Sequence, residues 1–234
     1  MTRAEYDASM QIDPEKERRL HELVTVFLAE NAKLNLTAFR TEETCWIGNI
    51  LDSLSFLDIV SDFPDMKSLL DLGTGGGFPL LPLAIMLPDV ICTGLDSMQK
   101  KIAAVERIVQ QMSLQNVRCL LGRAEELGRS PQHREQYDVV TIRAVAELPI
   151  LLEYAAAFVK VKGRIVVWKS MTIDKELQES LLARAELSCH LIAKHAYELS
   201  EGFGKRQLLI FEKTSPLLPK FPRGVGVPKK QPLK

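Results

Sequence analysis

The feature that most constrains this chain is a glycine-rich segment directly after an apolar run. Residues 69–72 (LLDL) are mostly apolar, residues 73–77 (GTGGG) hold four glycines, and Phe78 and Pro79 open the next apolar run. Glycine turns the backbone without a Cβ clash and lets a ligand approach closely, and a helix that follows offers free N–H groups in its first turn. The pattern predicts a strand, a turn and a helix that together bind a nucleotide-like cofactor.

The spacing of the glycines distinguishes between cofactors. A dinucleotide fingerprint, Gly-x-Gly-x-x-Gly/Ala, needs a small residue where this chain has Phe78. The chain instead shows acid-x-Gly-x-Gly-x-Gly from Asp71 onward, which resembles the first motif of S-adenosylmethionine-dependent methyltransferases. Asp96 ends the next apolar run, about where a ribose-binding carboxylate falls, roughly 20 residues after the loop. A structural turn beside a capping aspartate is the alternative interpretation.

Length and composition narrow the class of protein. The chain has 234 residues, 46% of them hydrophobic, which suits one large α/β domain, or one domain with small additions, and a substantial core. It has no run of roughly 18 apolar residues and no apolar leader, so we expect a cytoplasmic protein that does not enter a membrane. The four cysteines are widely spaced without a Cys-x-x-Cys pair, which argues against zinc and disulfides.

Basic residues gather in two patches, although 30 basic side chains balance 30 acidic ones. With no net charge to attract nucleic acid, any such binding depends on local patches. The first patch contains Lys160, Lys162, Arg164 and Lys169 with no acid between them. The second is the proline-rich stretch 216–234, whose basic residues are Lys220, Arg223, Lys229, Lys230 and Lys234 and which also lacks acids. Either patch could bind RNA or be ordinary solvated surface.

Two helices are predicted before the glycine segment. Asp13 followed by Pro14 is a helix start signal, and apolar residues within 20–28 recur at helical spacing. Thr41 is placed to cap a second helix. One stripe of that helix is mostly polar and faces either the cofactor site or solvent: Asn49, Asp52, Ser53 and Phe56. We expect residues 1–62 to form an N-terminal helical extension.

From residue 68 onward strands and helices alternate, which is typical of a parallel sheet covered on both faces. The predicted strands are 68–72, 90–95, 117–121, 138–142, 164–168, 189–197 and 207–212, and the predicted helices are 78–87, 99–112, 149–159 and 174–187. A hairpin signal at 202–204 (GFG) joins the last two strands and makes one strand antiparallel. The prediction is a doubly wound, Rossmann-like α/β domain with a seven-stranded, mostly parallel sheet over 63–214, followed by an extended tail at 215–234.

Side chains at the carboxyl ends of the strands are the candidates for ligand binding, because an open parallel sheet binds its ligand there. Asp96 can accept hydrogen bonds from both ribose hydroxyls, and the backbone at Ala124 and Glu125 can pair with an adenine edge. Arg143 follows an apolar strand and therefore needs a partner. That partner is either the cofactor or a salt bridge with Glu125 or Asp71.

The order of several short motifs resembles the RsmG (GidB) family. The motifs are 35–37 (NLT), 50–53 (ILDS), 71–79 (DLGTGGGFP), 95–97 (LDS), 122–126 (GRAEE) and 142–144 (IRA), and the likeness extends from about Leu20 into the basic tail. Members of this family use S-adenosylmethionine to methylate a guanine of small-subunit (16S) ribosomal RNA at N7. Two positions depart from the family pattern: Asn49 stands where His is frequent, and Ser170 follows Lys169 where Gly is frequent. The first departure bears on any proton-transfer role of that helix.

The resemblance implies roles for particular residues. It places Gly73, Phe78, Asp96, Ala124, Glu125 and Arg143 at the S-adenosylmethionine cofactor, and the glycine motif adds Gly75. The RNA-binding candidates are Arg123, Lys169, Lys220, Arg223, Lys229 and Lys230. No catalytic side chain and no metal ligand is assigned. The expected partner is 16S ribosomal RNA or the small ribosomal subunit, and we expect a monomer.

Missing motifs narrow the chemistry independently of the resemblance. The Asp/Asn-Pro-Pro-aromatic motif of exocyclic-amine methylation is absent after the fourth predicted strand, and no Pro-Cys offers the nucleophile for carbon-5 methylation of pyrimidines. A ring nitrogen with a free lone pair fits better, and guanine N7 needs only alignment with the cofactor methyl because it has no proton to remove. A small-molecule methyltransferase and a non-catalytic RNA-binding protein stay as alternatives. Phe78 disfavours a nicotinamide-dependent dehydrogenase.

Overall fold

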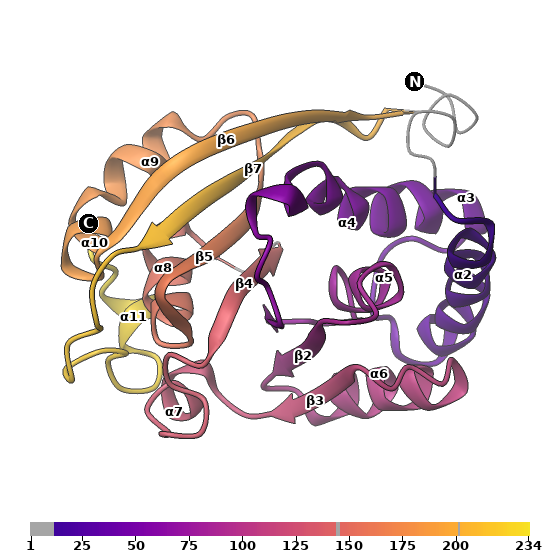
Figure 1. Cartoon of the computed structure of the whole chain (residues 1–234), viewed down its shortest axis with the longest axis horizontal. Coiled ribbons are helices and arrows are strands. Elements are labelled where there is room, and N and C mark those ends of the chain that lie inside the picture. Colours follow the sequence, from indigo (N-terminus) through magenta and orange to yellow (C-terminus); the bar gives the residue numbers. More distant parts are fainter. Residues whose placement is uncertain (1–11, 144–145, 201) are drawn as a thin grey trace.

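A seven-stranded sheet in the order β3-β2-β1-β4-β5-β7-β6 forms the centre of the protein (Figure 1). The computed structural model describes residues 12–143, 146–200 and 202–234. The strands are β1 (Ser68–Leu72), β2 (Ile91–Asp96), β3 (Val117–Leu121), β4 (Tyr137–Arg143), β5 (Val159–Ser170), β6 (Cys189–Leu199) and β7 (Gly204–Lys213). Strands β1 to β5 pair in parallel, and β7 runs antiparallel to β5 and β6. The predicted sheet, with its antiparallel strand, is confirmed.

Helices cover both faces of the sheet. The helices are α2 (Pro14–Leu34), α3 (Glu42–Cys45), α4 (Asp52–Leu54), α5 (Leu80–Met86), α6 (Gln99–Gln111), α7 (Ala124–Leu127), α8 (Leu148–Ala156), α9 (Asp174–Glu179), α10 (Leu181–Glu186) and α11 (Val227–Lys230). On one face Leu69 and Val139 pack into a core with α2, α5 and α6. Their neighbours Leu70 and Val140 point the other way, into a core with α8, α9 and α10. Strands buried on both faces in this way account for the nearly continuous apolar runs of the sequence.

The N-terminal helices begin at the residues that the sequence predicted. The Asp13 side chain accepts hydrogen bonds from two backbone N–H groups of α2, and Pro14 is its first residue. Thr41 caps α3 and exchanges hydrogen bonds with Thr44. After α3 the chain stays helical but changes its winding, through the π-helical η1 (Trp46–Leu51), α4 and the 3₁₀-helical η2 (Ser55–Asp62). A π-helical turn is frequent at functional sites.

The mostly polar stripe of this second helical segment lies inside the protein. Asn49, Asp52, Ser53 and Phe56 are each at most 1% exposed, so the interpretation of the stripe as a solvent face is wrong. The apolar face of the same segment is buried in the core that α2 and α5 share with the sheet. Both sides of the segment therefore contact protein, and its polar groups must find partners there.

The C-terminal part of the chain differs from two predictions. The predicted helix 174–187 is divided into α9 and α10 at Ser180, whose hydroxyl donates to the carbonyl of Leu177 and competes with the helical hydrogen bonds. The tail is not extended chain: Leu217 and Phe221 are buried in the core that contains residues of α8 and α10, and the tail includes the short helix α11. Apolar residues between the prolines and lysines give the tail a buried side.

All four cysteines are free thiols; Cys45, Cys92 and Cys189 are buried and Cys119 is partly so. Burial raises the pKa of the Cys45 thiol to about 11, which keeps it neutral.

Over the described ranges no helix combines the length and the apolar character needed to cross a membrane.

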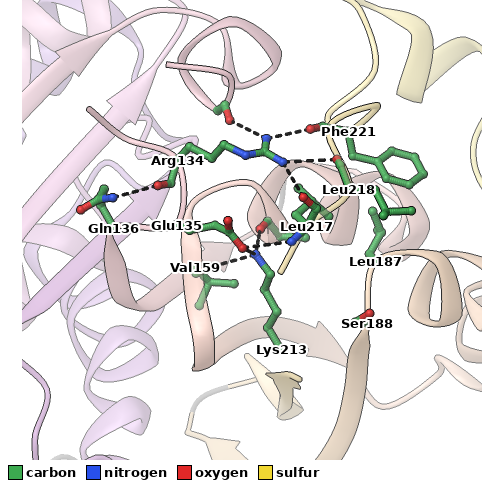
Figure 2. A network of polar contacts seen from close by, with 12 residues as sticks. Arg134, Glu135, Gln136, Val159, Leu187, Ser188, Lys213, Leu217, Leu218 and Phe221 are labelled. Carbon is green, nitrogen blue, oxygen red and sulfur yellow. Dashed lines mark hydrogen bonds and ion pairs between the residues drawn. The ribbon is translucent and has the colours of Figure 1, made fainter. Parts of the chain in front are cut away.

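A polar network ties the start of the tail to the sheet (Figure 2). The Arg134 guanidinium donates to the carbonyls of Leu217, Leu218 and Phe221 at 2.8–3.3 Å. Lys213 is fully buried, and its ammonium donates to Glu135 at 2.6 Å and to two backbone carbonyls. Burial lowers the pKa of Lys213, against the opposing effect of Glu135. Arg134 thus supplies donors to backbone carbonyls that follow the end of β7, and Glu135 joins Lys213 to the start of the tail by also accepting from the backbone N–H of Leu217.

We predict that Lys213→Met destabilises the protein by about 2–5 kcal/mol, because it removes a buried cation and leaves acceptors without a donor. Lys205→Met on the same strand is the matched control, since Lys205 and its partner Glu198 are more than 60% exposed, and it should change stability by less than about 0.5 kcal/mol. Urea unfolding of both variants measures the difference. Equal stabilities would contradict a structural role for the buried ammonium.

Candidate functional site

A cavity of about 610 Å³ lies at the carboxyl ends of the first four strands. All seven predicted cofactor residues line it: Gly73, Gly75, Phe78, Asp96, Ala124, Glu125 and Arg143. Two RNA-binding candidates, Arg123 and Lys229, line it as well. The sequence analysis missed Lys101 and Tyr154, which also line it. Lys101 could have been found from its position in the first turn of α6, five residues after Asp96, whereas Tyr154 has no local signal.

The glycine loop forms one wall of the cavity, and its backbone takes left-handed conformations that favour glycine. Gly73, Gly75 and Gly77 all have φ between 58° and 92°. A Cβ on Gly77 would also lie 2.5 Å from Leu81 Cδ1 in the helix that follows. The backbone N–H groups of residues 73 and 74 donate to the carbonyl of Leu95, which fixes the loop against the end of β2.

The Asp96 carboxylate is held by two backbone donors and a nearby cation. Its Oδ2 accepts from the backbone N–H of Gly75 at 3.1 Å, and its Oδ1 accepts from the N–H of Met98 at 2.9 Å. The Lys101 ammonium lies 3.8 Å from Oδ2. A carboxylate has about four acceptor positions. Asp96 therefore keeps acceptor capacity for a diol in the cavity.

Arg143 at the end of β4 reaches into the N-terminal helical segment. Its guanidinium donates to Asp52 Oδ2 at 2.9 Å, to Asn49 Oδ1 at 2.8 Å and to the carbonyl of Gly48 at 3.0 Å. The salt-bridge partner is thus Asp52, and the interpretation that named Glu125 or Asp71 is wrong. The guanidinium carbon also lies 5.8 Å from the centroid of the Phe78 ring. These bonds use three of five N–H donors, so donors remain for a ligand in the cavity.

Asp52 has further partners that sequence reasoning missed. It is fully buried, with the Arg206 guanidinium 3.1 Å from Oδ2 and the Tyr197 hydroxyl donating to Oδ1 at 2.6 Å. Tyr197 and Arg206 are cross-strand partners on β6 and β7. Burial beside this carboxylate raises the pKa of Tyr197 above its ordinary value. A cross-strand pair more than 140 residues from Asp52 leaves no local signal in the sequence.

The remaining RNA-binding candidates lie outside the cavity and differ in their surroundings. Lys169 is bound to Glu176, Lys220 to Glu186 and Arg223 to Glu153. Lys230 is exposed. In the part of the chain that the structure describes, no ion pair involves Arg123, Lys229 or Lys230. Of the motif 142–144, residue 144 lies outside the described residues.

The fold and the cavity together define the class of protein. The chain has a glycine loop that follows an acidic residue of the first strand, and it has a carboxylate at the end of the second strand. Together with a seven-stranded sheet that contains one antiparallel strand, these features are the arrangement of S-adenosylmethionine-dependent methyltransferases. The crystal structure of TYW2 from M. jannaschii in complex with AdoMet has this fold. It superimposes with a TM-score of 0.52 on 69% of this chain and 76% of its own, at 15% sequence identity.

The sequence narrows the class to one family. The pattern of the GidB family, rRNA small subunit methyltransferase G, matches residues 16–208. Ribosomal RNA small subunit methyltransferase G of Deinococcus radiodurans is 40% identical over 97% of this chain and 89% of its own length. The protein of the same name from Carboxydothermus hydrogenoformans is 36% identical over 96% and 94%. This chain belongs to the rRNA small subunit methyltransferase G family, which confirms the resemblance.

Asp71 beneath the glycine loop has an unusual acidity. The side chain is 1% exposed and accepts a hydrogen bond from the Thr141 hydroxyl at 3.1 Å. Burial raises its pKa from 3.8 to about 6, against the lowering effects of the Thr141 hydroxyl and of Arg143. Between these two pKa values the Asp71 carboxyl is protonated in the folded protein and ionised in the unfolded chain. The contribution of Asp71 to stability therefore falls as the pH rises from about 4 to about 6, and it is constant at higher pH.

We predict that Asp71→Asn removes this fall. The difference in unfolding free energy between the variant and the parent protein should shift in favour of the variant by about 1–2 kcal/mol from pH 5 to pH 8, because only the parent loses stability over this range. Asp138→Asn is the control: partial burial would raise the pKa of Asp138, but hydrogen bonds from Lys160 and Ser68 hold it below its ordinary value, so its effect lies at lower pH. Urea unfolding at both pH values decides. The same pH dependence in Asp71→Asn as in the parent would refute the raised pKa.

Proposed function

We propose that this protein transfers the methyl group of S-adenosylmethionine to N7 of a guanine in the 16S ribosomal RNA of the small subunit. One observation supports this most: in a member of a family of small-subunit rRNA methyltransferases, the glycine loop, Asp96, residues 124–125 and Arg143 converge on one cavity. As part of the same proposal the protein acts as a cytoplasmic monomer.

The cavity residues suit an adenosine-containing cofactor. Asp96 has acceptor capacity for the ribose hydroxyls, and the backbone of Ala124 and Glu125 can address the adenine edge. The free donors of Arg143 suit the acceptor groups at the other end of the molecule. When bound, S-adenosylmethionine supplies an electrophilic methyl group on a sulfonium. The protein residues hold and orient it.

The reaction needs orientation more than proton transfer. Guanine N7 attacks through a lone pair that carries no proton, so no side chain has to act as a base. Asn49, at the position where the family frequently has His, lines the cavity and accepts a hydrogen bond from Arg143. Burial raises the pKa of Tyr154 to about 12, so this cavity residue stays neutral at physiological pH. The side chains at the cavity are thus suited to positioning.

The basic residues divide by how readily they could bind phosphate. Arg123 and Lys229 line the cavity and, like Lys230, have no ion pair in the described ranges, so they can meet an RNA backbone directly. Lys169 and Lys220 would first have to leave carboxylates. N7 lies on the major-groove edge, which RNA exposes where a helix is interrupted. We expect the target guanine in a loop or a distorted pair.

We predict methyl transfer to 16S RNA at a rate that is nearly independent of pH between roughly 6.5 and 9. Single-turnover reactions with saturating cofactor, on small subunits from a strain that lacks the protein, measure this rate. Large-subunit RNA is the matched control and should receive no methyl group. A rate that climbs about tenfold per pH unit would reveal a general base. Absence of transfer to 16S RNA, with cofactor bound, would favour the small-molecule alternative.

A further inference from the structure

The C-terminal tail reaches the cofactor cavity. Lys229, in the short helix α11, lines the cavity beside Glu125 and Tyr154. Just before α11 the backbone N–H of Gly226 donates to Glu125 Oε1 at 2.9 Å, and the Tyr154 hydroxyl donates to the same oxygen at 3.2 Å. A carboxylate that lines the cavity therefore binds the tail directly. Gly226 has φ 77°, the left-handed conformation that glycine adopts without strain.

A second carboxylate holds the tail three residues earlier. Glu153 on α8 is fully buried, and it accepts a hydrogen bond from the backbone N–H of Arg223 at 2.7 Å. The Arg223 guanidinium adds three bonds of 2.6–3.0 Å to the two Glu153 oxygens. If the Arg223 side chain were removed from the docked tail, Glu153 would be a buried carboxylate without this counter-charge, which is strongly unfavourable. Glu153 precedes Tyr154 on α8, so this helix both holds the tail and lines the cavity.

The tail arrives at this point already fixed upstream. Arg134 binds the carbonyl of Phe221 at 2.8 Å, and the Phe221 ring is buried (Figure 2). From Phe221 to Lys229 the chain is thus held at three successive points by Arg134, Glu153 and Glu125. Only the last of these belongs to the predicted cofactor site. The first two act at a distance from the cavity.

We propose that residues 221–230 form a wall of the cofactor cavity, and that the Glu153–Arg223 pair is the positioning element that keeps this wall in place. Arg223 is therefore a positioning residue for cofactor binding, because three hydrogen bonds fix its guanidinium on the buried Glu153 carboxylate. The two equilibria are linked: if docking of the tail raises the affinity for the cofactor by some factor, bound cofactor raises the equilibrium constant for docking of the tail by the same factor. The inference rests on the proposed function in one respect, that S-adenosylmethionine occupies this cavity.

Calorimetry of the full-length protein with S-adenosylmethionine and with S-adenosylhomocysteine, without RNA, tests the proposal. Arg223→Ala should weaken both affinities by at least about fivefold. Arg223→Lys should be intermediate, because it keeps the charge but loses the planar fork. Lys205→Ala, which removes a cation from an exposed ion pair elsewhere, is the control and should bind the cofactor like the parent.

Hydrogen exchange of the unmutated protein gives a second measurement that does not depend on a variant folding. Saturation with S-adenosylhomocysteine should slow amide exchange in residues 222–231 by at least about fivefold, and should leave the hairpin turn at 202–204 unchanged. Parent-like affinity of Arg223→Ala, or unaltered exchange of the tail with cofactor bound, would overturn the inference and leave the proposed function intact. No binding by the parent protein would overturn both.

Discussion

The arrangement of the cavity depends on one buried carboxylate, that of Asp52. The carboxylate binds Arg143 from β4, Arg206 from β7 and the hydroxyl of Tyr197 from β6. The backbone carbonyl of Asp52 also accepts a hydrogen bond from the Trp168 indole on β5. Removing one partner of a buried ion pair typically costs about 3–5 kcal/mol, because the other charge stays buried. The N-terminal helical segment and the antiparallel end of the sheet are therefore joined through the group that also orients Arg143 in the cavity.

Charge inside this protein is used mostly for positioning. Asp52 orients Arg143, Glu153 holds Arg223, and Lys213 pairs with Glu135 next to the start of the tail. Each pair joins segments that are far apart in the chain. A reaction that depends on aligning a nucleophile with a methyl donor benefits from such fixed geometry more than from a titrating group. The arrangement of these pairs is consistent with the proposed transfer to a ring nitrogen.

Sequence reasoning succeeded where the signal is local. The glycine loop, the strand spacing and the helix starts at Asp13 and Thr41 depend on neighbouring residues, and the structure bears them out. The partners of Asp52 could not be predicted, because they come from strands more than 90 residues away. The five prolines between residues 216 and 232 predict an extended tail, which the structure does not show. The fact that Arg223 meets a buried glutamate on α8 appears only once the chain is folded.

The central claim is that a guanine of 16S RNA receives a methyl group at N7 from the cofactor held in this cavity. Ribosomal RNA from cells that lack the protein, compared with RNA from the same cells supplied with it, tests the claim most directly. Chemical cleavage at 7-methylguanosine, with mass spectrometry of the fragments, locates the modification. We expect one 7-methylguanosine in 16S RNA that disappears without the protein and returns with it. An unchanged 16S modification pattern, or a methyl group lost from any other atom, would contradict it.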